Sequence, residues 1–95
     1  MNNKDLLNDT EVEELVTAHP DWHLDGVHMR RSYTFKDFRA AFAFMTQVAL
    51  IAERHFHHPE WSNVYNKVEI SISSHDVGGL SARDSEFLKA VDAIS

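Results

Sequence analysis

The stretch 35-FKDFRAAFAFMTQVALIAERHF-56 decides the fold, because its apolar residues recur at the three- and four-residue steps of an α-helix. Two neighbouring apolar rows run along it, and they consist of Phe38, Phe42, Met45, Ala49, Ala52 and Phe56, and of Ala41, Phe44, Val48 and Ile51. A stripe this wide predicts a long core helix that packs on a sheet with one side and meets a second subunit with another. Pro59 cannot continue a helix, so the helix is expected to end before it.

The segments around this helix predict two further helices and two β-hairpins, because capping residues, turn dipeptides and alternating apolar residues mark their ends. Upstream, we expect a helix that starts at the capping residues Asn8 to Thr10, with a capping box Thr10-Glu11-Val12-Glu13, and that ends near Ala18. It is followed by a hairpin with strands over 22–24 and 27–34 around an Asp25-Gly26 turn. Downstream, we expect a second hairpin with strands over 63–65 and 68–73 around an Asn66-Lys67 turn, and then a loop over 76–80. The last helix is expected to be capped by Ser81 and Asp84, and its inward-facing residues are Phe87, Leu88, Val91 and Ile94. Hairpins separated by helices predict an α+β fold, in which a four-stranded antiparallel sheet carries three helices packed on one face in the order α-β-β-α-β-β-α.

The length and composition of the chain exclude several classes of protein. Its 95 residues suit a single domain over 1–95 with one core, and so small a core favours association with further copies. A formal net charge of -6 argues against nucleic acid as a direct partner, since phosphate binding draws on clustered Lys and Arg. The sequence has no cysteine, which removes disulfides, thiolate metal sites and a cysteine nucleophile. No apolar run approaches the roughly 18 residues of a membrane span, and the first residues lack an apolar signal core, so we expect a cytoplasmic protein without membrane contact.

The histidines are the main candidates for chemistry. Four of the seven lie between positions 55 and 75, and the pair His57-His58 stands at the end of the long helix. Imidazole, with an ordinary pKa of about 6.5, both gives and takes protons near neutral pH. Adjacent histidines at a helix end point in different directions and need separate explanations, although one of them could simply be a cation favoured by the helix dipole. His57, His58 and His75 are therefore predicted site residues, and the other histidines are interpreted as surface or boundary residues.

Several neighbours of these histidines are ambiguous. Glu53 lies one helical turn before His57, which brings its carboxylate near that imidazole if the helix persists, but it could equally be a solvated charge. Asp84 could orient a histidine or only cap a helix. Trp22 and Tyr65 are either core residues or stacking partners for a flat ring.

A metal centre is the alternative that the histidines leave open. His57, His58 and His75 could supply nitrogen ligands, with Glu53 or Asp84 adding a carboxylate. The spacing lacks the H-E-x-x-H pattern and every paired Cys/His pattern, so no metal ligand is predicted.

Taken together, Glu53-x-x-x-His57-His58-Pro59, Tyr65, His75 and Asp84 resemble the signature of the pterin-4a-carbinolamine dehydratases, and the words HHPEWSNVYNKV and GGLSARD are similar to that family as well. The resemblance implies dehydration of a 4a-hydroxytetrahydropterin, the product left by an aromatic amino acid hydroxylase, to quinonoid dihydropterin and water. This elimination needs positioned acid/base groups and neither a redox cofactor nor a metal. The implied roles are His57 and His75 as the acid/base pair, His58 as substrate binder with a share in proton transfer, Glu53 and Asp84 as orienting carboxylates, Trp22 as a shield over the pterin, and Tyr65 as a supporting residue.

The resemblance also implies partners. It implies homodimers or homotetramers and a functional link to a hydroxylase in tetrahydrobiopterin recycling. One alternative is a protein-binding module, because animal members of the family are dimerisation cofactors for a homeodomain transcription factor. Another is action on a different pterin, such as one linked to molybdenum cofactor metabolism. The spacing of the histidines favours the enzyme, because an adapter would not require it.

Overall fold

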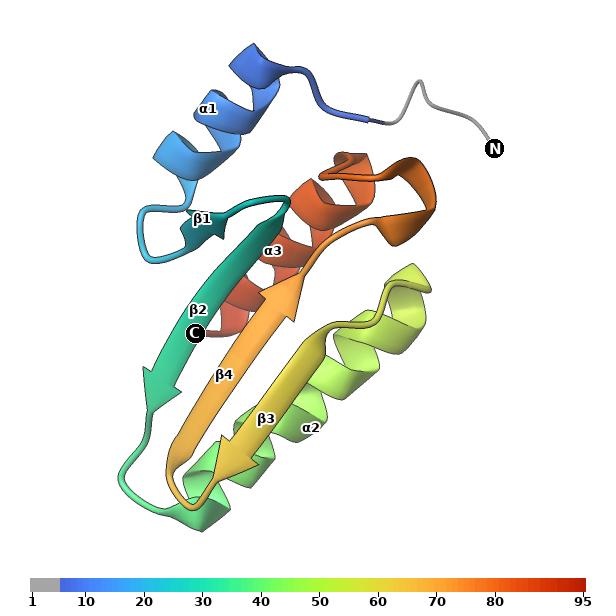
Figure 1. The fold of residues 1–95 in the computed structure, drawn as a ribbon. Helices are drawn as coiled ribbons and strands as arrows, with labels where there is room; N and C mark the ends of the chain where they lie inside the picture. Colours follow the sequence, from blue (N-terminus) through green and yellow to red (C-terminus); the bar gives the residue numbers. More distant parts are fainter. Residues whose placement is uncertain (1–5) are drawn as a thin grey trace.

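The computed structural model describes residues 6–95, which form a β-sheet backed by helices (Figure 1). Within that range there are three α-helices, four strands and a short 3-10 helix, in the predicted order. Their bounds are α1 Asp9–Ala18, β1 His23–Asp25, β2 His28–Thr34, α2 Phe38–His55, β3 Glu60–Val64, β4 Lys67–Ile72, η2 His75–Val77 and α3 Ala82–Ile94. The predicted α+β class is confirmed, while residues 1–5 of the predicted 1–95 domain lie outside the described part of the chain.

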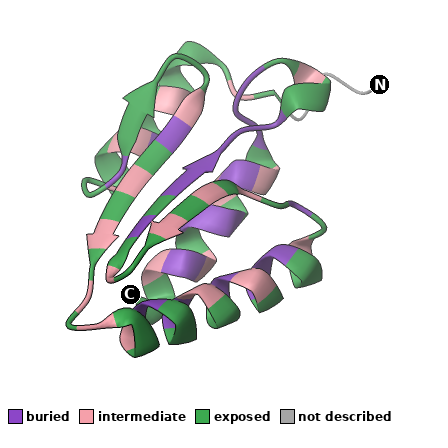
Figure 2. Ribbon diagram, turned by 60° about the horizontal axis from the view of Figure 1, so that its bottom comes forward, coloured by how far each residue is buried: buried purple, intermediate pink, exposed green. Residues whose placement is uncertain are grey.

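The sheet has the order β1-β2-β4-β3, and every neighbouring pair is antiparallel. β4 therefore lies between β2 and β3. Its alternating residues Val68, Ile70 and Ile72 are buried, and α2 and α3 cover that face of the sheet (Figure 1). Buried residues follow the sides of α2 and α3 that face the strands (Figure 2). Alternation with period two thus gives the sheet one apolar face and one polar face.

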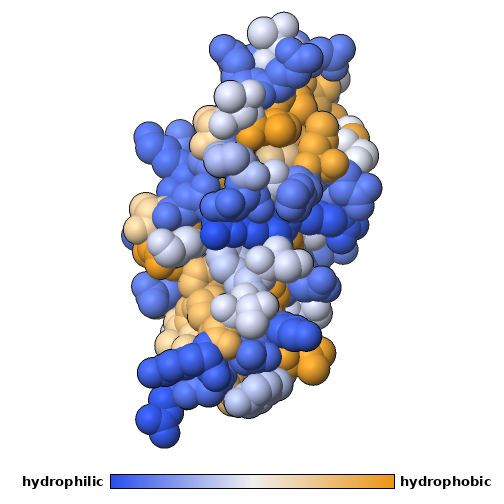
Figure 3. All heavy atoms as spheres, turned by 90° about the vertical axis from the view of Figure 1, so that its left-hand side faces the viewer, coloured by the Kyte–Doolittle hydropathy of each residue, from blue (hydrophilic) through white to orange (hydrophobic). Residues whose placement is uncertain are grey.

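Helix α1 lies at the β1 edge of the sheet, at the opposite end of the molecule from the β3–β4 turn (Figure 1). Viewed from this side, polar atoms cover much of the surface and hydrophobic atoms form separate patches (Figure 3). The helix is capped by Asn8, whose side chain accepts from Glu11 N while the Glu11 carboxylate accepts from Asn8 N. The capping box predicted at Thr10 is therefore wrong by two residues, because Asn8 already satisfies the first free N–H groups.

Helix α2 begins later than predicted. The Asp37 side chain accepts a hydrogen bond from Ala40 N at 2.8 Å and caps the helix, so Phe35 and Lys36 precede it. None of the helices in residues 6–95 combines the length and apolar character needed to cross a membrane.

The C-terminal end of α2 sets the direction of the residues that follow. Phe56 adopts a left-handed conformation with φ of 50°. Its N–H donates to Glu53 O, and the next N–H, that of His57, donates to Ala52 O at 3.0 Å. These two bonds form a Schellman motif, which ends the helix and reverses the chain direction. His57 and His58 therefore lie beyond the end of the helix, in a chain segment that runs in a new direction.

Both hairpin turns lie one residue away from the predicted positions. Asp25 still pairs with His28, so the first turn consists of Gly26 and Val27, and Gly26 has φ of 63°, as the first central position of a type II′ turn requires. In the second hairpin Val64 pairs with Lys67, so the turn consists of residues 65–66. β3 also begins at residue 60 and not at 63.

Helix α3 confirms the predicted cap. Ser81 and Asp84 form a capping box, and Phe87, Leu88 and Val91 are buried as expected. Ile94 was also predicted to face inward, but it is exposed in the last turn.

Candidate active site

Three segments that are distant in sequence meet at one end of the molecule. They are the C-terminal end of α2, the η2 segment that follows β4, and the first turn of α3 (Figure 1). His57 directly follows the C-cap of α2, η2 begins with His75, and α3 contributes Asp84. The fold thus brings two of the predicted histidines and one predicted carboxylate to the same end of the sheet.

His57 and Asp84 form a buried pair. His57 Nε2 lies 2.6 Å from Asp84 Oδ1, and the Asp84 side chain has no exposed surface. Asp84 Oδ2 accepts two further hydrogen bonds, from Ser74 Oγ at 2.7 Å and from Ser81 N at 2.8 Å. A carboxylate only accepts, so Nε2 carries the hydrogen and the His57 ring is fixed in one orientation. The two interpretations of Asp84 are therefore both correct, since one residue caps the helix and holds the imidazole.

His58 pairs with Glu53, at 2.5 Å between Nε2 and Oε1. Both side chains are exposed. The prediction that Glu53 lies beside His57 is wrong, and the reason is the end of α2. The spacing of four residues makes neighbours only within a continuous helix, and the left-handed Phe56 interrupts it one residue before His57.

His75 lies at the start of η2 with an exposed side chain. Its Nε2 is 3.2 Å from Glu60 Oε1, and its ring meets the His28 ring edge-on with centroids 5.6 Å apart. The next residue, Asp76, bonds Arg83 on α3 at 2.7 Å. This hydrogen bond lowers the pKa of Asp76 and connects η2 to the helix that carries Asp84.

Tyr65 lies away from the histidines within one chain, contrary to the prediction. β3 begins at Glu60, beside His75, and Tyr65 follows the last residue of that strand at the β3–β4 turn. A strand advances about 3.3 Å per residue, so the two ends of β3 are roughly 15 Å apart. The chain turns at Tyr65, with φ of 51°, and its side chain is exposed.

Trp22 is a core residue in this structure. It is 1% exposed, and its indole N–H donates to Asp92 Oδ1 at 2.9 Å. The same carboxylate group accepts from His19 Nδ1 at 2.6 Å and from Arg31 at 3.0 Å. Of the two interpretations of Trp22, this environment favours packing, because neither face of a ring so buried is open to a ligand.

Sequence reasoning did not identify three residues around the site. Ser74 is buried between Asp84 and Ser81, and a serine after a strand carries no signal of such a contact. Glu60 and His28 meet His75 only because β2, β3 and β4 are neighbours in the sheet. The sequence predicts His28 only as a surface or boundary residue, and nothing in it indicates the contact with His75.

The metal centre considered from the sequence is not formed. In the described part of the chain, His57, His58 and His75 do not converge with Glu53 or Asp84 on a common point, and the ligand-type residues that do converge are His28, Glu60 and His75. His57 and His58 each have a carboxylate partner of their own.

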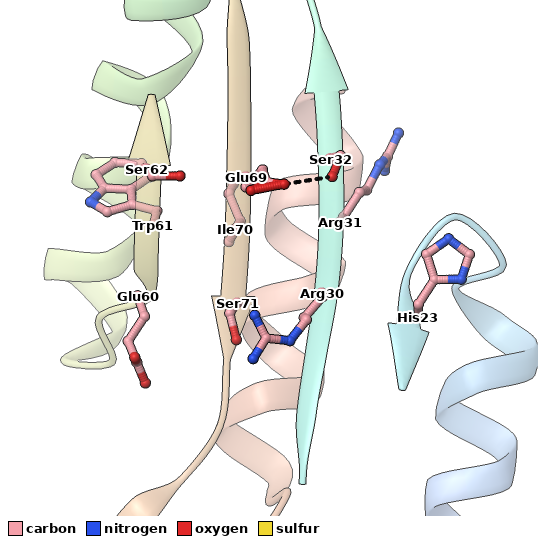
Figure 4. Close-up of a pocket in the computed structure, with 10 residues that line it drawn as sticks. All are labelled: His23, Arg30, Arg31, Ser32, Glu60, Trp61, Ser62, Glu69, Ile70 and Ser71. Atoms are coloured by element: carbon pink, nitrogen blue, oxygen red, sulfur yellow. Dashed lines mark hydrogen bonds between the residues drawn. The ribbon is translucent and has the colours of Figure 1, made fainter. Parts of the chain in front are cut away.

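A shallow hollow of about 280 Å³ lies on the polar face of the sheet (Figure 4). Pairing across the strands aligns Arg30, Ser71 and Glu60 in one row along this hollow. Glu60 also contacts His75, so the hollow adjoins the η2 segment. Ser71 Oγ is buried and has no hydrogen-bond partner among residues 6–95.

The fold and the site together define a small α+β protein with histidines paired to carboxylates, an arrangement suited to acid/base transfer of protons. A buried carboxylate fixes one imidazole, and two further imidazoles are exposed beside acidic partners. Three imidazoles, those of His57, His58 and His75, can therefore donate or accept protons.

Comparison with known proteins identifies the family. The model of the pterin 4 alpha carbinolamine dehydratase family matches residues 5–94. Two relatives are provisionally named pterin-4-alpha-carbinolamine dehydratases. The one from Rhizorhabdus wittichii is 53% identical over 94% of this chain and 94% of its own length. The one from Synechococcus sp. (strain WH7803) is 48% identical over 94% of this chain and 96% of its own length. The crystal structure of a transcriptional coactivator/pterin dehydratase from Brucella melitensis is similar with a TM-score of 0.87 at 40% identity, over 93% of this chain and 96% of that one. The chain belongs to the pterin-4a-carbinolamine dehydratase family, which is a family of hydro-lyases.

Proposed function

We propose that this protein dehydrates a 4a-hydroxytetrahydropterin to quinonoid dihydropterin and water at the site formed by His57, His58 and His75. The observation that carries the proposal is the buried His57–Asp84 pair next to the exposed η2 histidine, in a chain of this family. The reaction breaks the bond between carbon 4a and the hydroxyl oxygen, which leaves as water after it receives a proton. A second proton is lost from a ring nitrogen, so the elimination is balanced without an oxidant or reductant.

The roles follow from the environment of each imidazole. His57, held through Nε2 by Asp84, keeps Nδ1 for exchange with the substrate. His75, at the solvent-exposed start of η2, is its partner in acid/base catalysis. His58 binds the pterin and shares in proton transfer, with Glu53 orienting its ring. Trp22 and Tyr65 are left out of the proposed site, since one is buried and the other lies at the far end of β3.

The proposed reaction needs no redox cofactor, because loss of water neither oxidises nor reduces the substrate. It needs no metal either, because the imidazoles supply the proton transfers. We place the reaction in the cytoplasm and in tetrahydrobiopterin recycling after an aromatic amino acid hydroxylase. Action on another pterin would use the same imidazoles, so a substrate series distinguishes the two cases.

Turnover of enzymatically generated 4a-hydroxytetrahydropterin tests the proposal. His57→Ala, His58→Ala and His75→Ala should each lower the rate at least about tenfold, since general acid/base catalysis contributes ~10²–10⁴-fold and is here divided among several groups. His23→Ala, at an exposed histidine of β1, is the matched control and should retain the wild-type rate. A wild-type rate no higher than that of buffer would refute the proposal, and loss of activity on addition of a chelator would point to a metal.

We also propose that the protein works as a homodimer or homotetramer. Three large apolar side chains of α2 are exposed, of which Phe38 and Phe42 are neighbours one helical turn apart and Leu50 lies about two turns further along. The same surface would serve the alternative role as a protein-binding module, which the description of the Brucella relative as a coactivator makes relevant.

A further inference from the structure

A second cluster of ligand-type side chains lies at the polar face of the sheet, next to the proposed active site. Its members are His28 at the start of β2, Glu60 at the start of β3 and His75 in η2. Glu60 Oε1 is 3.2 Å from His75 Nε2 and 3.8 Å from His28 Nε2. One nitrogen or oxygen atom from each of the three residues lies within 4.8 Å of the others. Three separate segments therefore direct one ligand atom each at a common point.

These distances are close to those of a metal site. Zn²⁺ binds histidine nitrogen and carboxylate oxygen at about 2.0–2.2 Å, which places neighbouring ligand atoms of a tetrahedron roughly 3.3–3.6 Å apart. The two measured distances to Glu60 lie on either side of that range. His75 and Glu60 are about 70% exposed, so rotation of their side chains can close the remaining gap. His28 is less exposed and provides the fixed side of the site.

The chemistry of the three residues selects the kind of ion. Two imidazoles and one carboxylate suit a divalent transition metal, whereas Ca²⁺ and Mg²⁺ prefer oxygen ligands throughout. Arg30, a cation on the same face of the sheet, is paired with Asp25 at 2.8 Å, which offsets its repulsion of a metal ion.

A simple ion pair between His75 and Glu60 explains only part of this arrangement. It does not explain the position of His28. The ring of His28 meets the His75 ring edge-on, and its Nε2 also faces the Glu60 carboxylate. A shared cation requires ligand atoms grouped around one point, and those of His28, Glu60 and His75 all lie within 4.8 Å of one another.

We propose that His28, Glu60 and His75 form a binding site for one Zn²⁺ ion per chain, with water completing the coordination. The three protein ligands leave at least one position open, as in zinc sites that exchange a bound ligand. The ion occupies Nε2 of His75, so metal binding withdraws this imidazole from proton transfer. The cluster thus provides a means by which zinc inhibits the activity proposed above, while zinc binding itself does not depend on that activity.

Titration calorimetry of the full-length wild-type protein with zinc chloride, in a buffer that does not bind metal, tests the site without any substrate. We expect saturable binding of one ion per chain. His28→Ala and Glu60→Gln should each weaken it at least about tenfold, since removal even of outer partners of a metal ligand costs 10–100-fold. His23→Ala removes an exposed histidine outside the cluster and should bind as the wild type does.

Two results would overturn the site: no saturable binding by the wild type up to about millimolar zinc, or equal affinity of the wild type and both cluster variants. Circular dichroism of each variant checks that the fold is retained. Zinc-dependent shifts of the imidazole nitrogen resonances of His28 and His75, with those of His23 unchanged, locate the ion independently of affinity.

The inhibitory consequence rests on the proposed dehydratase activity and is measured separately. Each protein is compared with its own zinc-free rate, so a change in basal activity does not enter. Zinc should slow the wild type, and His28→Ala should need at least about tenfold more zinc for the same fractional loss. Equal zinc sensitivity of the two proteins would show that zinc does not inhibit through this cluster, while the calorimetry would still decide whether the site exists.

Discussion

Asp84 has no exposed surface, and its carboxylate serves a helix cap and an imidazole at the same time. Oδ2 accepts from Ser81 N, which completes the capping box, and from Ser74 Oγ, while Oδ1 faces His57. A buried carboxylate is stable only when such donors replace water. The position of His57 is therefore tied to the start of α3.

Replacement of this carboxylate should affect stability and activity together. In Asp84→Asn the amide NH₂ faces one of the former donors, so we expect the free energy of unfolding to fall by about 2–3 kcal/mol, the scale of hydrogen bonds to a charged group. Turnover of 4a-hydroxytetrahydropterin should fall at least about tenfold, because His57 loses its fixed orientation. Urea denaturation and the rate assay measure the two effects.

The matched control is Asp76→Asn, at the exposed carboxylate that bonds Arg83. An exposed pair contributes little, so the change in the free energy of unfolding should stay within about 1 kcal/mol. Equal stability of Asp84→Asn and the wild type would show that the buried carboxylate does not hold the site together.

At the residue scale, the sequence predicted the histidines better than their partners. The sequence names His57, His58 and His75 together with two carboxylates, Glu53 and Asp84. Glu53 was assigned to the wrong ring, and Glu60, the partner of His75, was missed. The cause is Phe56, because glycine or asparagine usually occupies the left-handed position after a helix and phenylalanine gives no such signal.

At the scale of elements, the sequence predicted the three α-helices and the four strands, with errors at their ends, but it did not predict the short 3-10 helix η2, which overlaps the expected loop. α2 begins at Phe38, three residues after the expected start and directly after its cap Asp37, and Asn8 replaces Thr10 as the cap of α1. Several polar residues in a row can each cap a helix, and tertiary contacts select one. Asn66 shows such a contact, since its side chain donates to Phe35 O at 2.9 Å and joins the second hairpin to the start of α2.

Strand β2 and helix α2 are joined by an aromatic cluster in which Tyr33 packs on Phe44, with centroids 4.5 Å apart, and on Phe35. Burial raises the pKa of Tyr33 above its ordinary value of about 10. Between the ordinary and the raised pKa the unfolded chain has lost this proton and the native protein has kept it. The free energy of unfolding should therefore fall as the pH rises through this interval.

Urea denaturation at a series of alkaline pH values measures this effect, and Tyr33→Phe should reduce it because no proton is left to lose. Tyr65→Phe is the control, since Tyr65 is exposed and its removal should leave the alkaline loss of stability unchanged. The same pH dependence in Tyr33→Phe and the wild type would assign it to other groups.

At the scale of the whole molecule, the exposed apolar side chains of α2 predict association. We expect wild-type protein to have a molar mass in solution that is a multiple of the 10.9 kDa chain. Phe42→Glu places a charge in the centre of this stripe and should yield the single-chain mass, because an unpaired charge is costly to bury. Light scattering coupled to size-exclusion chromatography measures both.

Phe42→Leu keeps the surface apolar and is the matched control, which should retain the wild-type mass. A wild type of 10.9 kDa at about 100 μM, far above the dissociation constants of stable oligomers, would contradict association. An unchanged mass in Phe42→Glu would place the contact elsewhere.

The order of the strands also limits what sequence can say about the site. Motif residues that follow one another closely, such as His58 and Tyr65, are separated by a full strand, while His28 and His75 become neighbours across the sheet. Local pattern predicts each strand, but pairing between distant strands depends on which faces can be buried together.

The central position of β4 has a consequence for synthesis of the chain. Met29 pairs with Ile72, so β2 has no inner partner until about three quarters of the protein has left the ribosome. Until then the first hairpin and the apolar stripe of α2 lack the strand that covers them, and this is the state most exposed to aggregation. Pairing of segments so distant in sequence is also slow compared with local helix formation. Folding is therefore expected to be completed only after β4 is released, and any chaperone that assists it should act on the nascent β1–β2–α2 segment.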